Sequence, residues 1–339
     1  MEVRQNSWEQ VEQPEDPLAA AKYWIRKESA VQGGVLLIYQ VILNVCVMVI
    51  AFAVTFAGAF SDALSGQELA YEKLMEQAMA ASGWGYLLAI VLGFGILLLW
   101  RKPRFVGYLF RKKAKRMTVK DFFCLLALVM APQVLAQLSY LGLLWLAEKL
   151  GMDPSVVDQL TNVDTESLSM FLYIGFGAPI SEEILFRGVL QESIAPYGKK
   201  IAVLGSAILF GLYHANLIQT PYAILVGLVL GYTALEYHIV WAVALHMCNN
   251  LLFALLLPEA LAFLPPMFVD MIIWALILGC FVASILILIR RWEEVRAWWL
   301  QDRLQPWQRK AFFGAPTVVV LMILCIIGMV FAVLLLLAQ

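Results

Sequence analysis

Charge is scarce in this chain of 339 residues, since Asp, Glu, Lys and Arg together make up 14% of it while hydrophobic residues make up 62%. The mean hydropathy of +0.79 lies far outside the range of soluble globular proteins. No polar stretch is long enough to form a separate soluble domain. The composition therefore excludes an ordinary soluble enzyme and predicts an all-α fold, a polytopic membrane helix bundle.

Cysteine and histidine are also rare. The five Cys residues lie in apolar runs without CxxC or CxxCH spacing, which argues against disulfides, haem and a cysteine metal site. The three His residues all lie between positions 214 and 246. His238 lies in a short predicted cytoplasmic turn, after Glu236 and Tyr237, where a histidine needs no special explanation. His214 and His246, by contrast, fall within predicted membrane helices.

Nine apolar runs are candidates for membrane helices: 33–60, 83–100, 122–147, 167–194, 201–215, 221–235, 239–257, 263–289 and 311–338. With the N-terminus in the cytoplasm, 22 of the 24 Lys and Arg residues fall on the cytoplasmic side if Arg187, at the inner part of its run, is counted there, and only Lys73 and Lys149 do not. Cytoplasmic loops show this bias, so the sequence predicts about nine transmembrane helices, N-in and C-out. The first run is too long for a signal-peptide core, so we expect no cleaved signal. The expected location is the cell membrane if the source is prokaryotic.

These runs divide the chain into four parts. We expect a cytoplasmic or interfacial segment over 1–32, with a short interfacial helix beginning near Asp16, and accessory helices over 33–166 that include a basic cytoplasmic loop at 101–121. A core over 167–257 carries the candidate chemistry. Two further helices follow over 258–339, joined by a Trp-rich interfacial linker at 290–310.

The basic loop suggests a lipid partner. Each of its cations would contribute ~1 kcal/mol near an anionic leaflet, so anionic lipids explain the loop better than nucleic acid, which we do not expect as a partner. The sequence indicates no oligomeric state.

Three charges stand within one apolar run, at Glu182, Glu183 and Arg187. Each charge costs ~2.5–3.5 kcal/mol at the centre of a membrane helix, so such residues usually face a polar cavity or a functional site. Glu183 and Arg187 are four residues apart on one helix stripe, which predicts a buried ion pair that braces the helix. Glu182 lies about 100° round the helix and points elsewhere, which leaves it available as a general base.

The histidines lie at a depth similar to that of this carboxylate. At 1.5 Å per residue, Glu182 and His214 are roughly 20 Å from the cytoplasmic turn between their helices, and His246 is roughly 14 Å from the next cytoplasmic turn. Phe210 and Asn250 lie four residues from His214 and His246 on the same helix faces. The sequence therefore predicts a shared site in which Phe210 serves as packing.

In this order, Glu182-Glu183-x-x-x-Arg187, Phe210-x-x-x-His214 and His246-x-x-x-Asn250 resemble the motifs of the CPBP intramembrane proteases. That family contains the CAAX prenyl endopeptidases and the bacterial Abi proteins. The resemblance covers about 70 of the 339 residues, and a Gly227-x-x-x-Gly231 run suited to close helix packing fits it. It implies an intramembrane endopeptidase acting on a membrane-associated or lipid-attached peptide or protein.

The resemblance also implies roles for individual residues. Glu182 and His214 would activate a water, while His246 and Asn250 would stabilise the oxyanion, with Glu183, Arg187 and Phe210 in support. No cofactor is favoured, because the chain has no HExxH motif and Asn250 is a poor zinc ligand. A zinc-dependent protease with Glu182, His214 and His246 as ligands stays open.

Other functions would use the same residue types. A Glu-Glu-x-x-x-Arg run can be a purely structural salt bridge, and a membrane His or Asn can simply join two helices. The alternatives are a non-catalytic immunity or scaffold protein and a proton-coupled transporter, although no inverted repeat supports a transporter. The residues do not identify the substrate or show whether it is prenylated.

Overall fold

The structure is a computed structural model that describes residues 16–66, 70–109, 111, 113, 115–161, 167–301 and 303–337. Within these ranges the chain forms helices and no strands, which confirms the all-α prediction. Six helical segments of the described chain are long and apolar enough to cross a membrane. The protein is thus an integral multi-pass membrane protein. The count of nine helices and the N-in orientation stay predictions.

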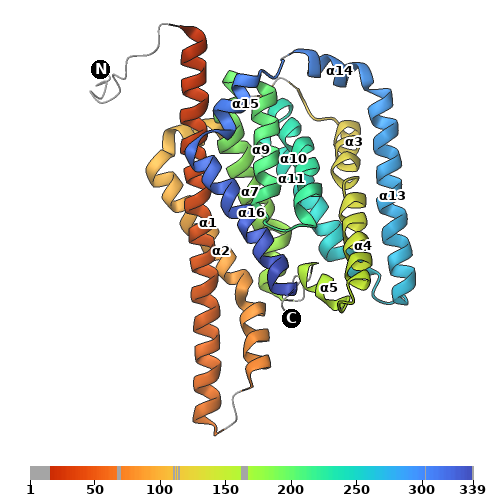
Figure 1. The fold of residues 1–339 in the computed structure, drawn as a ribbon. Helices are drawn as coiled ribbons and strands as arrows, with labels where there is room; N and C mark the ends of the chain where they lie inside the picture. The colour runs from red at the N-terminus through yellow and green to blue at the C-terminus, as the bar shows by residue number, and fades with distance from the viewer. Residues whose placement is uncertain are drawn as a thin grey trace.

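Helices α1 (Pro17–Leu64) and α2 (Tyr71–Leu109) form a long antiparallel hairpin. Asp16 caps α1 by accepting a hydrogen bond from the Leu18 amide at 2.9 Å. The 48 residues of α1 span ~72 Å, more than twice the ~30 Å of a hydrocarbon core. The hairpin accordingly extends past the other helices in Figure 1. The expected short helix near Asp16 is not separate, because α1 continues from it into the first apolar run.

The third apolar run is broken in two. Helix α3 (Val119–Met130) and helix α4 (Gln133–Lys149) meet at Ala131 and Pro132. Proline has no backbone N–H to donate and its ring crowds the preceding turn, so a single helix through this point is disfavoured. The short α5 (Ser155–Thr161) follows.

The fourth run alternates between α-helical and π-helical turns. It comprises α6 (Leu168–Leu172), a π-helical segment (Tyr173–Gly177), α7 (Ala178–Glu183), a second π-helical segment (Ile184–Gln191), α8 (Glu192–Ile194) and a final 3₁₀ turn (Ala195–Tyr197). π-Helical turns are rare and frequently mark functional sites. The predicted chemistry therefore lies on a helix with unusual local geometry.

Three shorter helices pack beside this segment. They are α9 (Lys199–Tyr213), α10 (Gln219–Glu236) and α11 (Ile239–Asn249), and α11 continues as a π-helical segment (Asn250–Leu256) into α12 (Leu257–Ala260). Figure 1 shows α9, α10 and α11 in the middle of the molecule, with α7 beside them and α3, α4 and α13 on one side. The candidate site is thus enclosed by other helices.

The C-terminal part contains α13 (Pro266–Arg290), α14 (Trp292–Gln301), α15 (Pro306–Phe313) and α16 (Pro316–Leu337). The Trp-rich linker at 290–310 contains two helices, because Pro306 begins a new helix behind a Gln305 capping box. Helix α14 contains no fully buried residue, whereas Phe312 of α15 is buried and fills the space left by the missing Cβ of Gly205.

Polar contacts join the segments that the sequence places on the cytoplasmic side. Lys199 bonds to Glu236 at 2.9 Å, and Arg291 bonds to Asp121 at 2.7 Å. Burial raises the pKa of Glu236, but its hydrogen bonds, including that from Lys199, outweigh burial and leave the pKa below its ordinary value. These loops and helix ends therefore lie at one end of the bundle, as the charge distribution predicts.

Candidate active site

Two consecutive carboxylates end helix α7 and contact the same imidazole. Oε1 of Glu183 lies 2.9 Å from Nδ1 of His246, and Oε2 of Glu182 lies 3.8 Å from its Nε2. The Glu183 side chain is fully buried, whereas 19% of the Glu182 side chain is exposed. Glu182 was expected to point away from Glu183, and it does take the more open side. Both carboxylates nevertheless contact His246, and the sequence did not indicate this shared contact.

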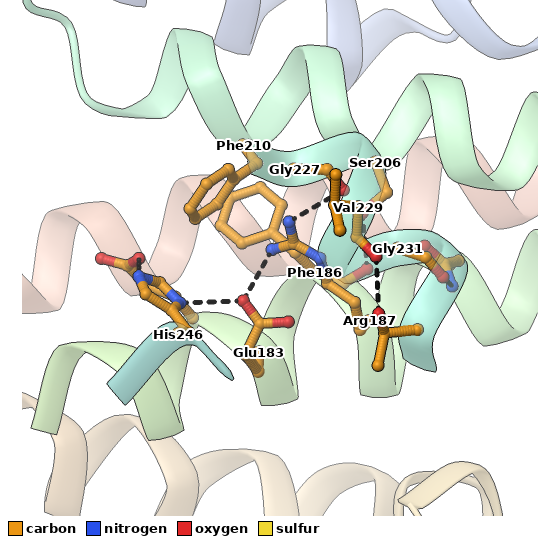
Figure 2. A network of polar contacts seen from close by, with 12 residues as sticks. Glu183, Phe186, Arg187, Ser206, Phe210, Gly227, Val229, Gly231 and His246 are labelled. Atoms are coloured by element: carbon orange, nitrogen blue, oxygen red, sulfur yellow. Dashed lines mark hydrogen bonds and ion pairs between the residues drawn. The ribbon is translucent and has the colours of Figure 1, made fainter. Parts of the chain in front are cut away.

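The predicted ion pair between Glu183 and Arg187 is present, with Oε1 and Nη1 3.1 Å apart and both side chains fully buried. Nη2 of Arg187 donates to the Gly227 carbonyl at 3.3 Å, and the guanidinium lies 4.3 Å from the centroid of the Phe210 ring. Figure 2 shows His246, Glu183 and Arg187 as one connected chain of contacts. Glu183 therefore connects Arg187 to His246.

Glycines let the carboxylate-bearing helix approach α10. Besides the bond from Arg187 to Gly227, Nε2 of Gln191 donates to the Gly231 carbonyl at 2.8 Å. A Cβ on Gly231 would lie 2.7 Å from Oε1 of Gln191, and one on Gly227 would lie 3.1 Å from Cα of Ala207. The Gly227-x-x-x-Gly231 run thus permits the close packing expected of it.

His214 follows the last residue of α9 and caps that helix, so it does not lie inside it as expected. Its Nδ1 is 2.8 Å from the Phe210 carbonyl oxygen. A carbonyl only accepts hydrogen bonds, so Nδ1 is the donor, and Nε2 has no hydrogen-bond partner among the described residues. The Phe210 ring meets the His214 and His246 rings edge to face. Phe210 thus packs between both imidazoles and the Arg187 cation.

Two adjacent amides lie near His246. Nδ2 of Asn250 donates to the Ile174 carbonyl at 3.0 Å, and its Oδ1 accepts from Nδ2 of Asn249 at 3.3 Å. Asn249 is 3% exposed, and its buried Oδ1 has no hydrogen-bond partner among the described residues. Sequence reasoning missed Asn249. The available signal was a second amide beside Asn250 in an apolar helix.

A cavity of about 600 Å³ brings the predicted residues together. Glu182, His214, His246 and Asn250 all line it, and so does Asn249. Its size is in the range of ~300–1,000 Å³ typical of ligand sites. Five tyrosines that the sequence motifs do not indicate also line this cavity: Tyr39, Tyr86, Tyr173, Tyr213 and Tyr222.

The residues that line the cavity do not form a zinc site as they stand. Among the described residues, no group of three or more His, Cys, Asp or Glu side chains is placed so that it could hold a metal ion. Glu182 and His246 are close to each other, but His214 does not complete a set of three.

One carboxylate, two imidazoles and two adjacent amides line one cavity inside a membrane helix bundle, and a second carboxylate, Glu183, contacts one of the imidazoles from a buried position. These are residue types that hydrolytic sites use. Residues 164–252 match the family described as "Type II CAAX prenyl endopeptidase Rce1-like". The match covers the segment that carries the three motifs, and it agrees with the resemblance to the CPBP intramembrane proteases. Searches of curated proteins and of solved structures gave no match.

Proposed function

We propose that this protein is a metal-free intramembrane endopeptidase that hydrolyses a peptide bond near the lipid-attached end of a membrane-bound protein. One observation carries the proposal: Glu182, His214, His246 and Asn250, all from the matched segment, line a single cavity. The family name refers to proteins with a prenylated CAAX end. A prenylated C-terminal peptide is therefore the substrate class that we propose for this chain.

Glu182 and His214 activate the water in this mechanism. Glu182 is the carboxylate that faces the cavity, and no Lys or Arg among the described residues pairs with it. It removes a proton from water while the water oxygen attacks the peptide carbonyl carbon, and Nε2 of His214 orients that water. The proton then passes to the departing amine as the C–N bond breaks. A positioned general base contributes ~10²–10⁴-fold to the rate.

His246 and Asn250 stabilise the developing oxyanion. Nδ2 of Asn250 has two hydrogens, and among the described residues only the Ile174 carbonyl accepts one of them. Nδ1 of His246 donates to Glu183, and a hydrogen on Nε2 would let the same ring donate to the oxyanion. Removing one oxyanion donor costs ~2.7–4 kcal/mol of transition-state stabilisation.

Glu183 is a positioning residue in this account. It holds His246 by the 2.9 Å contact and is itself held by Arg187 at 3.1 Å. A carboxylate of this kind fixes the tautomer and the orientation of an imidazole, as in other hydrolases. Arg187 in turn compensates the charge of Glu183 in a fully buried position.

Cleavage of a farnesylated peptide by the purified protein in lipid nanodiscs tests the proposal, with the cut bond located by mass spectrometry. We expect His214→Ala and Glu182→Ala to reduce turnover at least ~100-fold. The matched control is His238→Asn, because His238 lies outside the cavity and accepts from the Val240 amide as a helix cap that Asn can replace. Equal turnover in wild type, His214→Ala and Glu182→Ala would refute the mechanism.

Chelation tests the metal-free part of the proposal. Turnover should be unchanged after dialysis against a strong zinc chelator, and elemental analysis of the pure protein should show no stoichiometric metal. Activity that is lost on chelation and restored by zinc would establish the zinc-dependent alternative instead.

A further inference from the structure

A second, larger cavity lies on another face of α10. Its volume is about 720 Å³, and side chains from α3, α4, α10 and α13 enclose it, with residues of α14 at one end. Apolar residues such as Leu125, Leu228 and Phe281 dominate its wall. On α10, Leu225 and Leu228 face this cavity, whereas Tyr222, Ala223 and Val226 face the candidate active site. The helix therefore separates the two cavities.

One buried polar group in this wall points to a ligand. Ser284 of α13 is 5% exposed, and its Oγ has no hydrogen-bond partner among the described residues. A buried hydroxyl without a partner is unfavourable, so such groups usually meet a water or a ligand. Figure 1 shows α13 at the edge of the molecule beside α3 and α4. Ser284 is thus placed where a molecule entering between these helices would meet it.

The α14 end of the cavity is basic. A smaller cavity of about 310 Å³ adjoins it and shares the lining residues Cys124, Ile287, Arg291 and Glu294 with it. Lys120 and Arg290 complete the lining of the smaller cavity.

The three cations here differ in their pairing. Arg291 is paired with Asp121 at 2.7 Å and lies 3.7 Å from Glu294. Lys120 and Arg290 form no ion pair within the described part of the chain. Two cations are therefore available to an anionic group at the end of an apolar cavity.

We propose that these adjoining cavities bind a phospholipid with an anionic headgroup. An acyl chain occupies the apolar cavity between α13 and α10, and the phosphate lies between Lys120 and Arg290. Tryptophans of α14 lie at the same end, where membrane proteins place aromatic residues at headgroup level. The lipid holds α13 and α14 against α3 and α10. The lipid tail of a substrate is not the expected occupant of this cavity, because α10 separates the cavity from Glu182.

Lipid titration of the purified protein in a neutral detergent tests the proposal. Phosphatidylglycerol should raise the apparent melting temperature of wild type more than phosphatidylcholine does, and native mass spectrometry should show one retained phosphatidylglycerol. The double variant Lys120→Gln/Arg290→Gln should bind phosphatidylglycerol about 30-fold more weakly, since each cation contributes a factor of about five against an anionic headgroup. Ser284→Leu should weaken the binding of both lipids, because the larger side chain narrows the cavity.

Arg309→Gln/Lys310→Gln is the matched control, because it removes two exposed cations from α15, away from both cavities. It should keep the preference for phosphatidylglycerol. An equal loss of phosphatidylglycerol binding in the two double variants would overturn the proposal, because it would show that only the total charge of the protein matters. Equal stabilisation of wild type by the two lipids would overturn it too, as would displacement of the bound lipid by a farnesylated peptide.

Discussion

Replacing Arg187 by Met removes the cation from the buried network and leaves the Glu183 carboxylate without its counter-charge. Both side chains are fully buried, so solvent cannot compensate the charge that is left. Met has a similar length and is apolar, so the substitution leaves little empty volume. The variant therefore measures the loss of charge compensation rather than the creation of a cavity.

The expected loss can be worked out from the contacts. Removing one partner of a buried ion pair costs ~3–5 kcal/mol. The guanidinium also lies 4.3 Å from the Phe210 ring centroid, and a desolvated cation–π contact contributes ~2 kcal/mol, part of which the Met side chain regains as packing. We therefore expect Arg187→Met to destabilise the protein by about 4 kcal/mol.

The loss of stability can be measured by titrating the purified protein with a denaturing detergent and monitoring unfolding as the decrease of the helical circular dichroism signal. Arg296→Met is the matched control, because Arg296 pairs with Glu293 at 3.9 Å on an exposed surface. Such a pair contributes ~1 kcal/mol or less. The control should unfold almost as wild type does.

A double-mutant cycle shows whether charge compensation is the cause. In Glu183→Gln/Arg187→Met neither charge remains, while the amide oxygen of Gln can still accept from Nδ1 of His246. The double variant should be more stable than Arg187→Met alone. Strictly additive losses, or an Arg187→Met protein as stable as wild type, would refute the assignment of this pair as the brace of the helix.

Three further predictions follow from particular contacts. Gly231→Ala should cost ~1–3 kcal/mol in detergent unfolding, because its Cβ would lie 2.7 Å from Oε1 of Gln191. Gly279→Ala should be neutral, because its Cβ would meet no atom of the described residues within 4 Å. Glu236 has a lowered pKa in the folded protein, so the stability due to its bond with Lys199 is present above the ordinary pKa of a glutamate and is lost as the pH falls below it. In Glu236→Gln, the melting temperature should therefore fall less as the pH is lowered than it does in wild type. Glu183→Gln should lower the apparent melting temperature and reduce turnover partially, because the residue contacts both Arg187 and His246.

Much of the fold could be predicted from composition, but the helix breaks could not be read from apolar runs alone. Long apolar runs predict membrane helices whatever their exact ends. The break at Pro132 follows from the chemistry of proline, which an apolar run does not reveal. The polar start of α1 was predicted as a separate helix because its charges interrupt the apolar pattern. The described helix continues through it, with Glu28 and Gln32 buried.

Contacts within one helix could be predicted, and contacts between distant segments could not. The Glu183 and Arg187 pair follows from a spacing of four residues. The contact between Glu183 and His246 joins residues 63 positions apart, and only the packing of α7 against α11 brings them together. Depth along the helices predicted that Glu182 and His246 could share a site. It did not predict that two carboxylates contact one ring.

Asn249 and the tyrosines of the cavity show a different limit. In an apolar helix, an amide or a phenol can face lipid, another helix or a cavity, and sequence spacing alone does not distinguish these environments. The Asn249 side chain is buried and lines the site only because α11 packs against the helix that carries the carboxylates. Its role depends on tertiary packing, which the sequence motifs did not contain.

Turnover of Glu182→Gln measured beside Glu183→Gln tests the central claim most directly. Gln cannot take a proton from water, so we expect kcat/KM of Glu182→Gln to fall by ~10²–10⁴-fold while its melting temperature stays at the wild-type value. Glu183→Gln should retain measurable turnover and lose stability. Full activity in Glu182→Gln, or complete loss of activity in Glu183→Gln alone, would contradict the assignment of Glu182 as the general base.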